Sequence, residues 1–105
     1  MAEWLARALW SWALRLGTPL YFARLWWRGR REPGYRLAWA ERLGWLANPP
    51  RAGAVWIHAV SLGETRAAAA LVQALRECHP GLHLLLTHGT ATGREAGRAL
   101  LQAED

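Results

Sequence analysis

Two short apolar runs, each followed by a polar loop and a helical pattern, constrain the fold of this chain more than any other feature. The runs "AVWIHAV" (54–60) and "LHLLLTH" (82–88) have the length and apolar content of buried strands. The segments 65–78 and 94–104 are rich in strong helix formers. This alternating order is typical of a parallel sheet with crossover helices. Since two strands are too few for an independent sheet, the sequence predicts part of a doubly wound α/β fold.

The N-terminal segment has the pattern of amphipathic helices. On a helical wheel of residues 3–16 a polar stripe lies opposite an apolar one. The polar stripe is Glu3, Arg7, Ser11 and Arg15, and the apolar stripe is Leu5, Leu9, Trp12 and Leu16. The sequence "GTPL" then predicts a break, with Gly17 ending one helix, Thr18 capping the next and Pro19 at its first position.

These two predicted helices have the composition of segments that lie in a membrane interface. Five Trp residues fall within the first 27 positions, and Arg24, Arg28 and Arg31 share one side of the second helix. Packing on a soluble domain is the alternative. Arginines interrupt the apolar run, so neither a spanning helix of about 18 residues nor a removable signal peptide is predicted. The positive-inside tendency would place the Arg cluster on the cytoplasmic side.

The sequence predicts three segments. Residues 1–31 form amphipathic membrane-associating helices. Residues 32–53 contain a short helix ending at Gly44, followed by the linker "ANPPRAG". Residues 54–105 begin an α/β domain.

The loop after the first strand carries the first candidate site residues. Ser61 and Gly63 allow a tight turn, and Glu64 falls at the N-terminus of the next helix, outside the carboxyl end of the strand. The positive end of that helix stabilises a negative charge, as a general base requires. A helix-capping Glu is the alternative.

The loop after the second strand, "THGTATG", offers hydroxyls on Thr87, Thr90 and Thr92 and backbone N–H groups at a helix start. This pattern indicates a generic anion cradle. It has neither a Walker-type Lys nor G-x-G-x-x-G spacing, so it does not predict a nucleotide site.

The histidines and the single Cys78 do not form a metal-ligand set. His79 and His83 flank a turn and are expected to face solvent. His88 could touch a ligand from the Thr loop, whereas His58 is expected to be a satisfied core or edge residue. We therefore predict no metal site and no disulfide.

The formal charge of +5 favours anionic partners. One alternative function is therefore a basic, Trp-rich module that binds a membrane surface or nucleic acid without catalysis. The Trp residues lie on apolar helical faces and do not alternate with Arg on a sheet, so we expect no nucleic-acid partner.

Three blocks of the sequence together resemble the N-terminal part of bacterial 3-deoxy-D-manno-octulosonic acid (Kdo) transferases. The blocks are "RLWWRGRREPGYRLAWAERLGWL", "WIHAVSLGETRAAAALVQALRECHPGL" and "THGTATGREAG". The resemblance runs from about residue 20 to the end of the chain, and its specific core is the pattern H-x-V-S-x-G-E-T. This sequence departs from the family at Trp39-Ala40-Glu41-Arg42, where W-G-E-R is frequent, and at Thr90-Ala91-Thr92-Gly93, where T-P-T-G is frequent.

The resemblance implies a GT-B fold, in which two Rossmann-like domains enclose the site. The N-terminal domain would take the lipid A precursor and the C-terminal domain would take CMP-Kdo. Glu64 corresponds to the general base of an inverting displacement, and Gly63 keeps the approach to it open. Expected acceptor contacts are Ser61, Gly63, Thr87, Thr90, Thr92 and Arg94. The leaving group has one phosphate, so neither a metal nor a cofactor is expected.

The resemblance also implies a place in lipopolysaccharide biosynthesis at the cytoplasmic face of the cell inner membrane. The N-terminal helices would hold the enzyme there, with the Arg cluster at acidic head groups. The donor-binding domain is not in this sequence, so these 105 residues alone are not expected to catalyse transfer.

Overall fold

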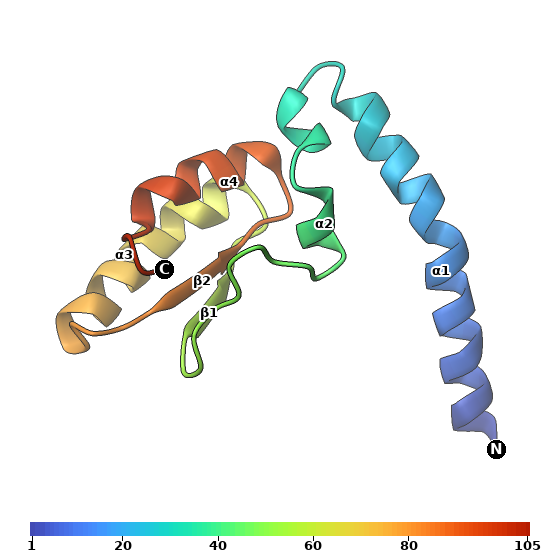
Figure 1. Ribbon diagram of the computed structural model, residues 1–105, viewed down its shortest axis with the longest axis horizontal. Helices are drawn as coiled ribbons and strands as arrows, with labels where there is room; N and C mark the ends of the chain where they lie inside the picture. Colours follow the sequence, from blue (N-terminus) through green and yellow to red (C-terminus); the bar gives the residue numbers. More distant parts are fainter. The chain divides into compact units, whose positions relative to one another are not determined.

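The computed structural model describes all residues, 1–105, and the chain divides into two compact units, Met1–Leu37 and Ala38–Asp105. The first unit contains helix α1 (Ala2–Arg28) and a 3-10 helix, Pro33–Arg36. The second contains α2 (Trp39–Arg42), β1 (Val55–His58), α3 (Leu62–Cys78), β2 (Leu84–Thr87), α4 (Ala91–Gly97) and a 3-10 helix, Arg98–Leu100 (Figure 1).

Helix α1 is continuous, so the predicted break at Gly17–Pro19 is wrong. Pro19 lies inside the helix and removes only one N–H donor, while the helix continues on both sides of it. Thr18 does not cap a second helix, because its hydroxyl donates back to the Leu14 carbonyl at 2.7 Å. Gly17 has no atom near the position of a Cβ and needs no special backbone conformation. Gly17 and Pro19, two positions apart, therefore weaken this helix without ending it.

The first unit closes with a turn fixed by arginine and aromatic side chains. Arg36 donates from Nε to the Trp26 carbonyl at 3.1 Å, and its guanidinium lies 4.5 Å from the centre of the Trp26 ring. The Arg28 guanidinium lies 4.5 Å from the buried Tyr35 ring. A Cβ on Gly29 would overlap the Arg36 side chain, so a larger residue here would require Arg36 to move.

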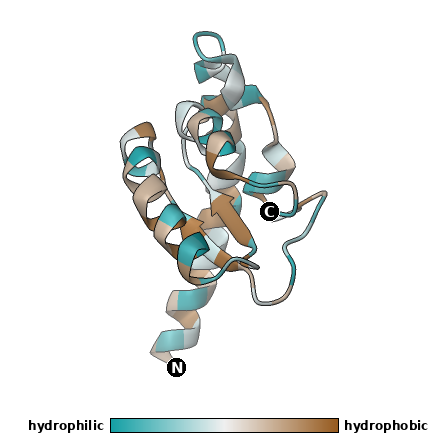
Figure 2. Cartoon of the chain, turned by 90° about the vertical axis from the view of Figure 1, so that its left-hand side faces the viewer, coloured by the Kyte–Doolittle hydropathy of each residue, from teal (hydrophilic) through white to brown (hydrophobic).

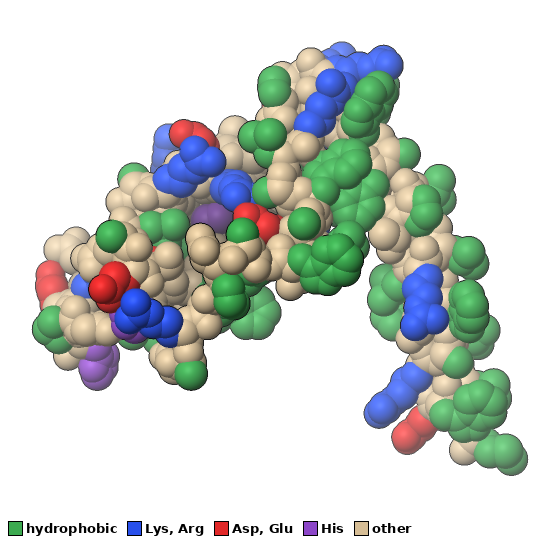
Figure 3. Space-filling view, viewed as in Figure 1, with side chains coloured by type: hydrophobic (Ala, Val, Ile, Leu, Met, Phe, Trp, Pro, Cys, Tyr) green, Lys and Arg blue, Asp and Glu red, His purple; other side chains and the backbone are tan.

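Most of the surface of α1 is apolar and exposed. Figure 3 shows hydrophobic side chains along the visible face of this helix, interrupted by short charged stretches. Leu9, Leu16 and Leu20 are each more than 70% exposed. The other exposed large side chains of the helix are Trp4, Leu5, Trp10, Trp12, Leu14, Tyr21, Trp26 and Trp27. None of the helices combines the length and the hydrophobicity that crossing a bilayer demands.

The second unit has the predicted order of strand, helix, strand and helix. Strands β1 and β2 pair in parallel, with Val55 opposite Leu84 and His58 opposite Thr87. The aliphatic residues are Val55 and Ile57 in β1 and Leu84, Leu85 and Leu86 in β2. Brown marks the hydrophobic part of the sheet in Figure 2. Before them, α2 ends in a turn at Gly44, whose φ of +86° is a left-handed conformation that favours glycine. The short parallel sheet is therefore confirmed as part of a mixed α/β unit.

The core of this unit lies between the sheet and the two longer helices. Helices α3 and α4 pack against each other beside the strands (Figure 1). Leu84, Ala59 and Val72 are 2–4% exposed. Trp56, whose neighbours along β1 point toward the helices, is 68% exposed on the other face of the sheet. One face of this two-stranded sheet is thus covered and the other is open.

The helices begin earlier than the composition predicted because polar side chains cap them. Helix α3 starts at Leu62 behind the Ser61 cap, and α4 starts at Ala91 behind the Thr90 cap. Helix α4 also ends at Gly97 and continues only as the 3-10 turn to Leu100, so the predicted helix over 94–104 is too long at its C-terminal end.

Candidate functional site

The carboxyl ends of β1 and β2 lie at one edge of the sheet, and each leads into the N-terminus of a helix. Hydrogen bonds join the two loops directly. The N–H groups of Gly89 and Thr90 both donate to the Val60 carbonyl, each at 3.0 Å. The Thr90 hydroxyl donates to the same oxygen at 3.1 Å. The predicted candidate residues of the two loops are therefore neighbours.

Glu64 is the third residue of α3, and its environment combines capping with exposure. The Ser61 hydroxyl accepts from the Glu64 N–H at 3.4 Å. In return, Glu64 Oε2 accepts from the Val60 N–H at 2.6 Å, one residue beyond the position that closes a usual capping box. The side chain is exposed, and this bond uses only one carboxylate oxygen. Capping and an accessible carboxylate thus coexist at Glu64.

Thr65, which is buried, and His88, which is half-buried, support this turn from beneath. Thr65 is 1% exposed and donates from its hydroxyl to the Ser61 carbonyl at 2.8 Å. His88 Nδ1 lies 2.9 Å from the Ala59 carbonyl and 3.2 Å from the Thr65 hydroxyl. A carbonyl only accepts, so Nδ1 carries the proton. The sequence analysis did not single out Thr65, although its position four residues after the Ser61 cap is a signal for a hydroxyl bonding back into the turn.

The other side of the His88 ring packs against Gly97. A Cβ at that position would lie 2.3 Å from His88 Nε2. Nδ1 is thus held by the Ala59 carbonyl and Nε2 lies beside Gly97, while contact of His88 with a ligand stays a prediction. Its side chain ties β1, α3 and α4 together.

Thr90 and Gly93 let the two helix starts approach closely. The Thr90 hydroxyl accepts from the Gly93 N–H at 3.1 Å. A Cβ on Gly93 would lie 2.9 Å from that hydroxyl and 3.1 Å from the Ser61 carbonyl carbon. The N–H groups of Gly89, Thr90 and Gly93 are all donated within the protein. The predicted anion cradle is therefore largely occupied by the protein's own hydrogen bonds.

The other predicted contact residues lie in three different settings. Thr87 Oγ1 accepts from Trp56 Nε1 at 2.8 Å and lies 2.8 Å from His58 Nδ1, on the open face of the sheet. Thr92 is exposed on the first turn of α4. Arg94 binds Glu41 through both terminal nitrogens, at 2.5 and 3.1 Å. The structure therefore separates Thr87 from Glu64 and gives Arg94 a carboxylate partner.

The remaining histidines follow the sequence analysis in part. His79 is exposed, as expected, and His58 is satisfied by Thr87. The side chain of His83 is only 27% exposed, and its Nδ1 has no hydrogen-bond partner, so the expectation that it faces solvent is wrong. Nowhere do three or more His, Cys, Asp or Glu side chains gather as a metal site would require.

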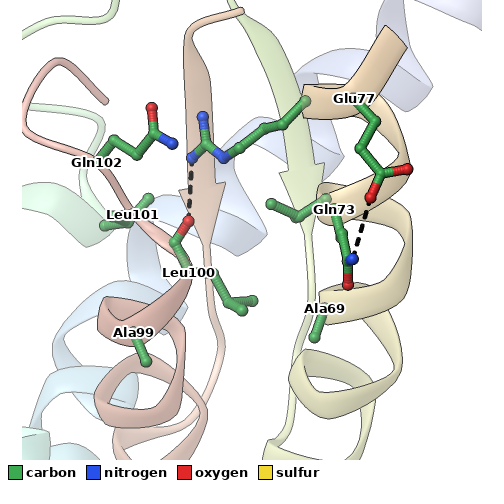
Figure 4. Close-up of a pocket in the computed structure, with 9 residues that line it drawn as sticks. Ala69, Gln73, Glu77, Ala99, Leu100, Leu101 and Gln102 are labelled. Atoms are coloured by element: carbon green, nitrogen blue, oxygen red, sulfur yellow. Dashed lines mark hydrogen bonds between the residues drawn. The ribbon is translucent and has the colours of Figure 1, made fainter. Parts of the chain in front are cut away.

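A groove lies between α3 and the C-terminal segment, lined by Ala69, Gln73, Glu77 and Ala99 among others (Figure 4). Arg76 crosses it and donates to the Leu100 carbonyl at 3.0 Å. Since α3 runs away from the carboxyl edge of the strands, this groove lies at the opposite end of the unit from Glu64 and is not part of the candidate site.

Asp105 binds Arg76, a residue of the same groove, and accepts from the Leu84 N–H. Burial of this carboxyl group acts to raise its pKa. Hydrogen bonds from Arg76 and from the N–H groups of Gln102 and Leu84 outweigh burial, so the pKa of Asp105 lies below its ordinary value of 3.8. This contact links α3, β2 and the C-terminal segment.

Residues 37–105 match the family described as 3-Deoxy-D-manno-octulosonic-acid transferase (kdotransferase). A 3-deoxy-D-manno-octulosonic acid transferase of Bordetella pertussis is 48% identical over 103 residues, which are 94% of this chain and 24% of that protein. The transferase of the same name from Haemophilus influenzae is 42% identical over 72 residues, 66% of this chain and 17% of that protein. A probable mitochondrial one of Arabidopsis thaliana is 34% identical over 79 residues. No solved structure matches the chain.

The chain belongs to the Kdo transferase family, since the family match covers 37–105 and includes both loops of the candidate site. This confirms the resemblance found in the sequence. The chain spans about a quarter or less of the length of these curated relatives.

Proposed function

We propose that this chain is the acceptor-binding part of an enzyme that transfers Kdo from CMP-Kdo to a lipid A precursor. The observation that carries the proposal is the exposed Glu64 carboxylate at the N-terminus of α3, held through Oε2 by the Val60 N–H. Its position outside the carboxyl ends of two parallel strands is where open α/β sheets bind ligands.

In this proposal Glu64 is the general base. Oε2 is held at 2.6 Å by Val60, so the carboxylate has a fixed orientation while Oε1 can accept the proton of an acceptor hydroxyl. The deprotonated oxygen attacks the anomeric carbon of Kdo as CMP departs from the opposite face, which inverts that centre. Gly63 precedes the base, is exposed and has only the Ser61 hydroxyl near the position of a Cβ, at 4.0 Å. The approach to Glu64 from this side is therefore open.

The proposed acceptor contacts come from both loops at the carboxyl edge of the strands, and Thr87 lies apart from Glu64 on the open face of the sheet. Gly63 and Thr92 are exposed, and Arg94 supplies a positive charge for a phosphate or sugar oxygen. The hydroxyls of Ser61, Thr87 and Thr90 already bond within the chain, so a contact with the acceptor would be a further hydrogen bond on the same oxygen. The reaction as proposed uses no metal or cofactor.

We also propose a GT-B architecture for the complete enzyme, in which this unit begins the Rossmann-like acceptor domain and a second domain binds CMP-Kdo. Support comes from the parallel pair with one covered face and from a length about a quarter of that of the Bordetella pertussis relative. A transfer site between two domains requires both, so the 105-residue chain alone is expected to be inactive.

The first unit would hold the enzyme at the cytoplasmic face of the inner membrane. This membrane location is supported by the exposed apolar surface of α1 and by the Arg residues near the C-terminal end of that helix, Arg24, Arg28 and Arg31. Trp side chains at a membrane interface place their rings at head-group level, which suits an enzyme whose acceptor is a lipid.

Kdo transfer from CMP-Kdo to a lipid A precursor tests this function directly. We expect activity in the chain extended by its natural downstream sequence and none in the 105-residue chain. Glu64→Gln in the extended protein should lower turnover by about 10²–10⁴-fold, the usual contribution of a general base, with the fold retained. Full turnover in this variant would remove Glu64 from the base role, and inactivity of the extended wild type would contradict the proposed function as a whole.

A further inference from the structure

Two neighbouring residues of α2 bind the segment 89–94, which runs from the loop before α4 into the first turn of that helix. Glu41 holds Arg94 with two parallel hydrogen bonds, from Nη1 at 2.5 Å and from Nη2 at 3.1 Å. Arg42 donates from Nη2 to the Gly89 carbonyl at 3.4 Å. The two contacts lie on either side of Thr90, so α2 fixes both ends of the segment 89–94.

The same segment fixes the end of β1. The N–H groups of Gly89 and Thr90 and the Thr90 hydroxyl converge on one oxygen, the Val60 carbonyl. On its other side, Val60 donates its N–H to Glu64 Oε2 at 2.6 Å. Val60 is therefore the point at which the second loop meets the proposed base.

From this geometry we propose that Glu41 and Arg42 are positioning residues for Glu64. They hold the segment 89–94, this segment holds Val60, and Val60 orients the Glu64 carboxylate. The inference rests on the proposed function, in which Glu64 is the base. The segment Trp39-Ala40-Glu41-Arg42 lies outside both loops of the candidate site. Its position in the sequence therefore did not indicate that it orients the Glu64 carboxylate.

The solvent exposure of the Glu41–Arg94 pair distinguishes a positioning role for Glu41 from a general contribution to the stability of the fold. The Glu41 and Arg94 side chains are each 42% exposed, so water screens the pair and its loss costs the fold little. The effect of breaking the pair should therefore appear as disorder of the segment 89–94 and a displaced carboxylate.

The first test measures hydrogen exchange of the Val60 amide in the extended protein, as wild type, Glu41→Gln, Glu41→Asp and Glu95→Gln. Glu95 forms an exposed ion pair with Arg98 on α4 at 3.6 Å and does not contact the loop, so its variant is the matched control. We expect protection of the Val60 amide to fall about tenfold in Glu41→Gln, to recover in Glu41→Asp and to stay unchanged in Glu95→Gln. Equal protection in all four proteins would overturn the proposal.

The second test measures transfer kinetics of the same variants in the extended protein. We expect Glu41→Gln to lower kcat on the order of tenfold to a hundredfold with the acceptor KM unchanged, because a displaced base slows chemistry without weakening binding. A raised acceptor KM with unchanged kcat would show that Glu41 acts through acceptor binding by Arg94, and would overturn the positioning role.

The experiments distinguish a wrong assignment of Glu64 as the base from a failure of the positioning proposal. If Glu64→Gln keeps full turnover, the proposed function is wrong at that residue, while the exchange experiment still decides whether Glu41 controls the Val60 contact.

Discussion

Glycine at position 63 lies in the first turn of α3, where its missing side chain costs helix stability. Alanine would gain about 0.5–1 kcal/mol in a helix, and a Cβ here meets only the Ser61 hydroxyl at 4.0 Å. We therefore expect Gly63→Ala to raise the urea midpoint of the chain. If the open approach to Glu64 serves the acceptor, the same substitution in the extended enzyme lowers kcat/KM. A variant that is both more stable and fully active would show that Gly63 has no role at the site.

Gly97 provides the opposite case on a neighbouring helix. A Cβ there would lie 2.3 Å from Nε2 and 2.7 Å from Cε1 of His88, a ring fixed by the Ala59 carbonyl. Gly97→Ala should therefore destabilise the second unit by about 1–3 kcal/mol, as overpacking does. The measurement is urea unfolding beside Gly81→Ala, whose Cβ would meet no atom within 4 Å. Equal midpoints for Gly97→Ala and the wild type would show that the ring moves aside freely.

The Asp105 carboxylate should make the free energy of unfolding depend on pH in the acid range. Because its pKa in the folded chain lies below the ordinary value of 3.8, the ionised form stabilises the fold above that pH. This contribution is lost as pH falls through the lowered pKa, where the unfolded carboxyl group is already protonated. We expect Asp105→Asn to reduce stability by roughly 1 kcal/mol near neutral pH.

The difference between Asp105→Asn and the wild type should close only below pH 3.8. Urea midpoints across a pH series measure it. Glu104→Gln is the control, since the Glu104 side chain is 65% exposed and lies 3.6 Å from Arg51, so its loss should change nothing measurable. A pH-independent difference would mean that Asp105 acts by packing and not by charge.

Among the elements, α1 contains two residues with low helix propensity. Gly17 costs about 1 kcal/mol and Pro19 about 3 kcal/mol relative to alanine in a helix interior, and Pro19 also lacks the N–H that would bond within the helix. We expect Gly17→Ala with Pro19→Ala to slow amide exchange over the following turn, residues 20–23. Unchanged exchange would indicate that the turn after Pro19 is already as stable as the rest of α1.

The same helix shows the limits of local sequence signals. The order of strands and helices in the second unit was predictable, because each element has its own period and its own polar boundary, as at Ser61 and Thr90. Gly17, Thr18 and Pro19 carry equally strong stop and start signals, yet the helix continues through them. Such signals are preferences of a few kcal/mol at most, and the turns on both sides override them.

The candidate site was predictable only where its contacts are local. Ser61 and Glu64 are three residues apart, so their cap follows from spacing alone. The partner of Arg94 is Glu41, 53 residues away, and that of His88 is Ala59, directly after β1 and 29 residues away. Contacts of this kind depend on how elements pack, and no periodicity in the sequence records them.

At the scale of the whole chain, the two units have different surfaces and should be separable in their interactions. The apolar stripe of α1 is Leu5, Leu9, Trp12, Leu16 and Leu20, each exposed by 48% or more. These side chains recur at helical spacing along one side of the helix, while Ser11 belongs to the polar stripe between Arg7 and Arg15. At a membrane interface the apolar stripe can contact acyl chains while the polar stripe contacts lipid head groups.

This predicts how the 105-residue chain binds vesicles that contain anionic lipid. Leu9→Glu with Leu16→Glu should weaken partitioning by more than about tenfold, since burying each leucine contributes about 1.5–3 kcal/mol. Ser11→Glu adds the same kind of charge without removing apolar contact and should cause a smaller loss, one that raised salt reduces further. Co-sedimentation with vesicles at two salt concentrations measures both effects. If Ser11→Glu weakened binding as much as the leucine substitutions, charge alone would attract the chain and the apolar stripe would need another partner.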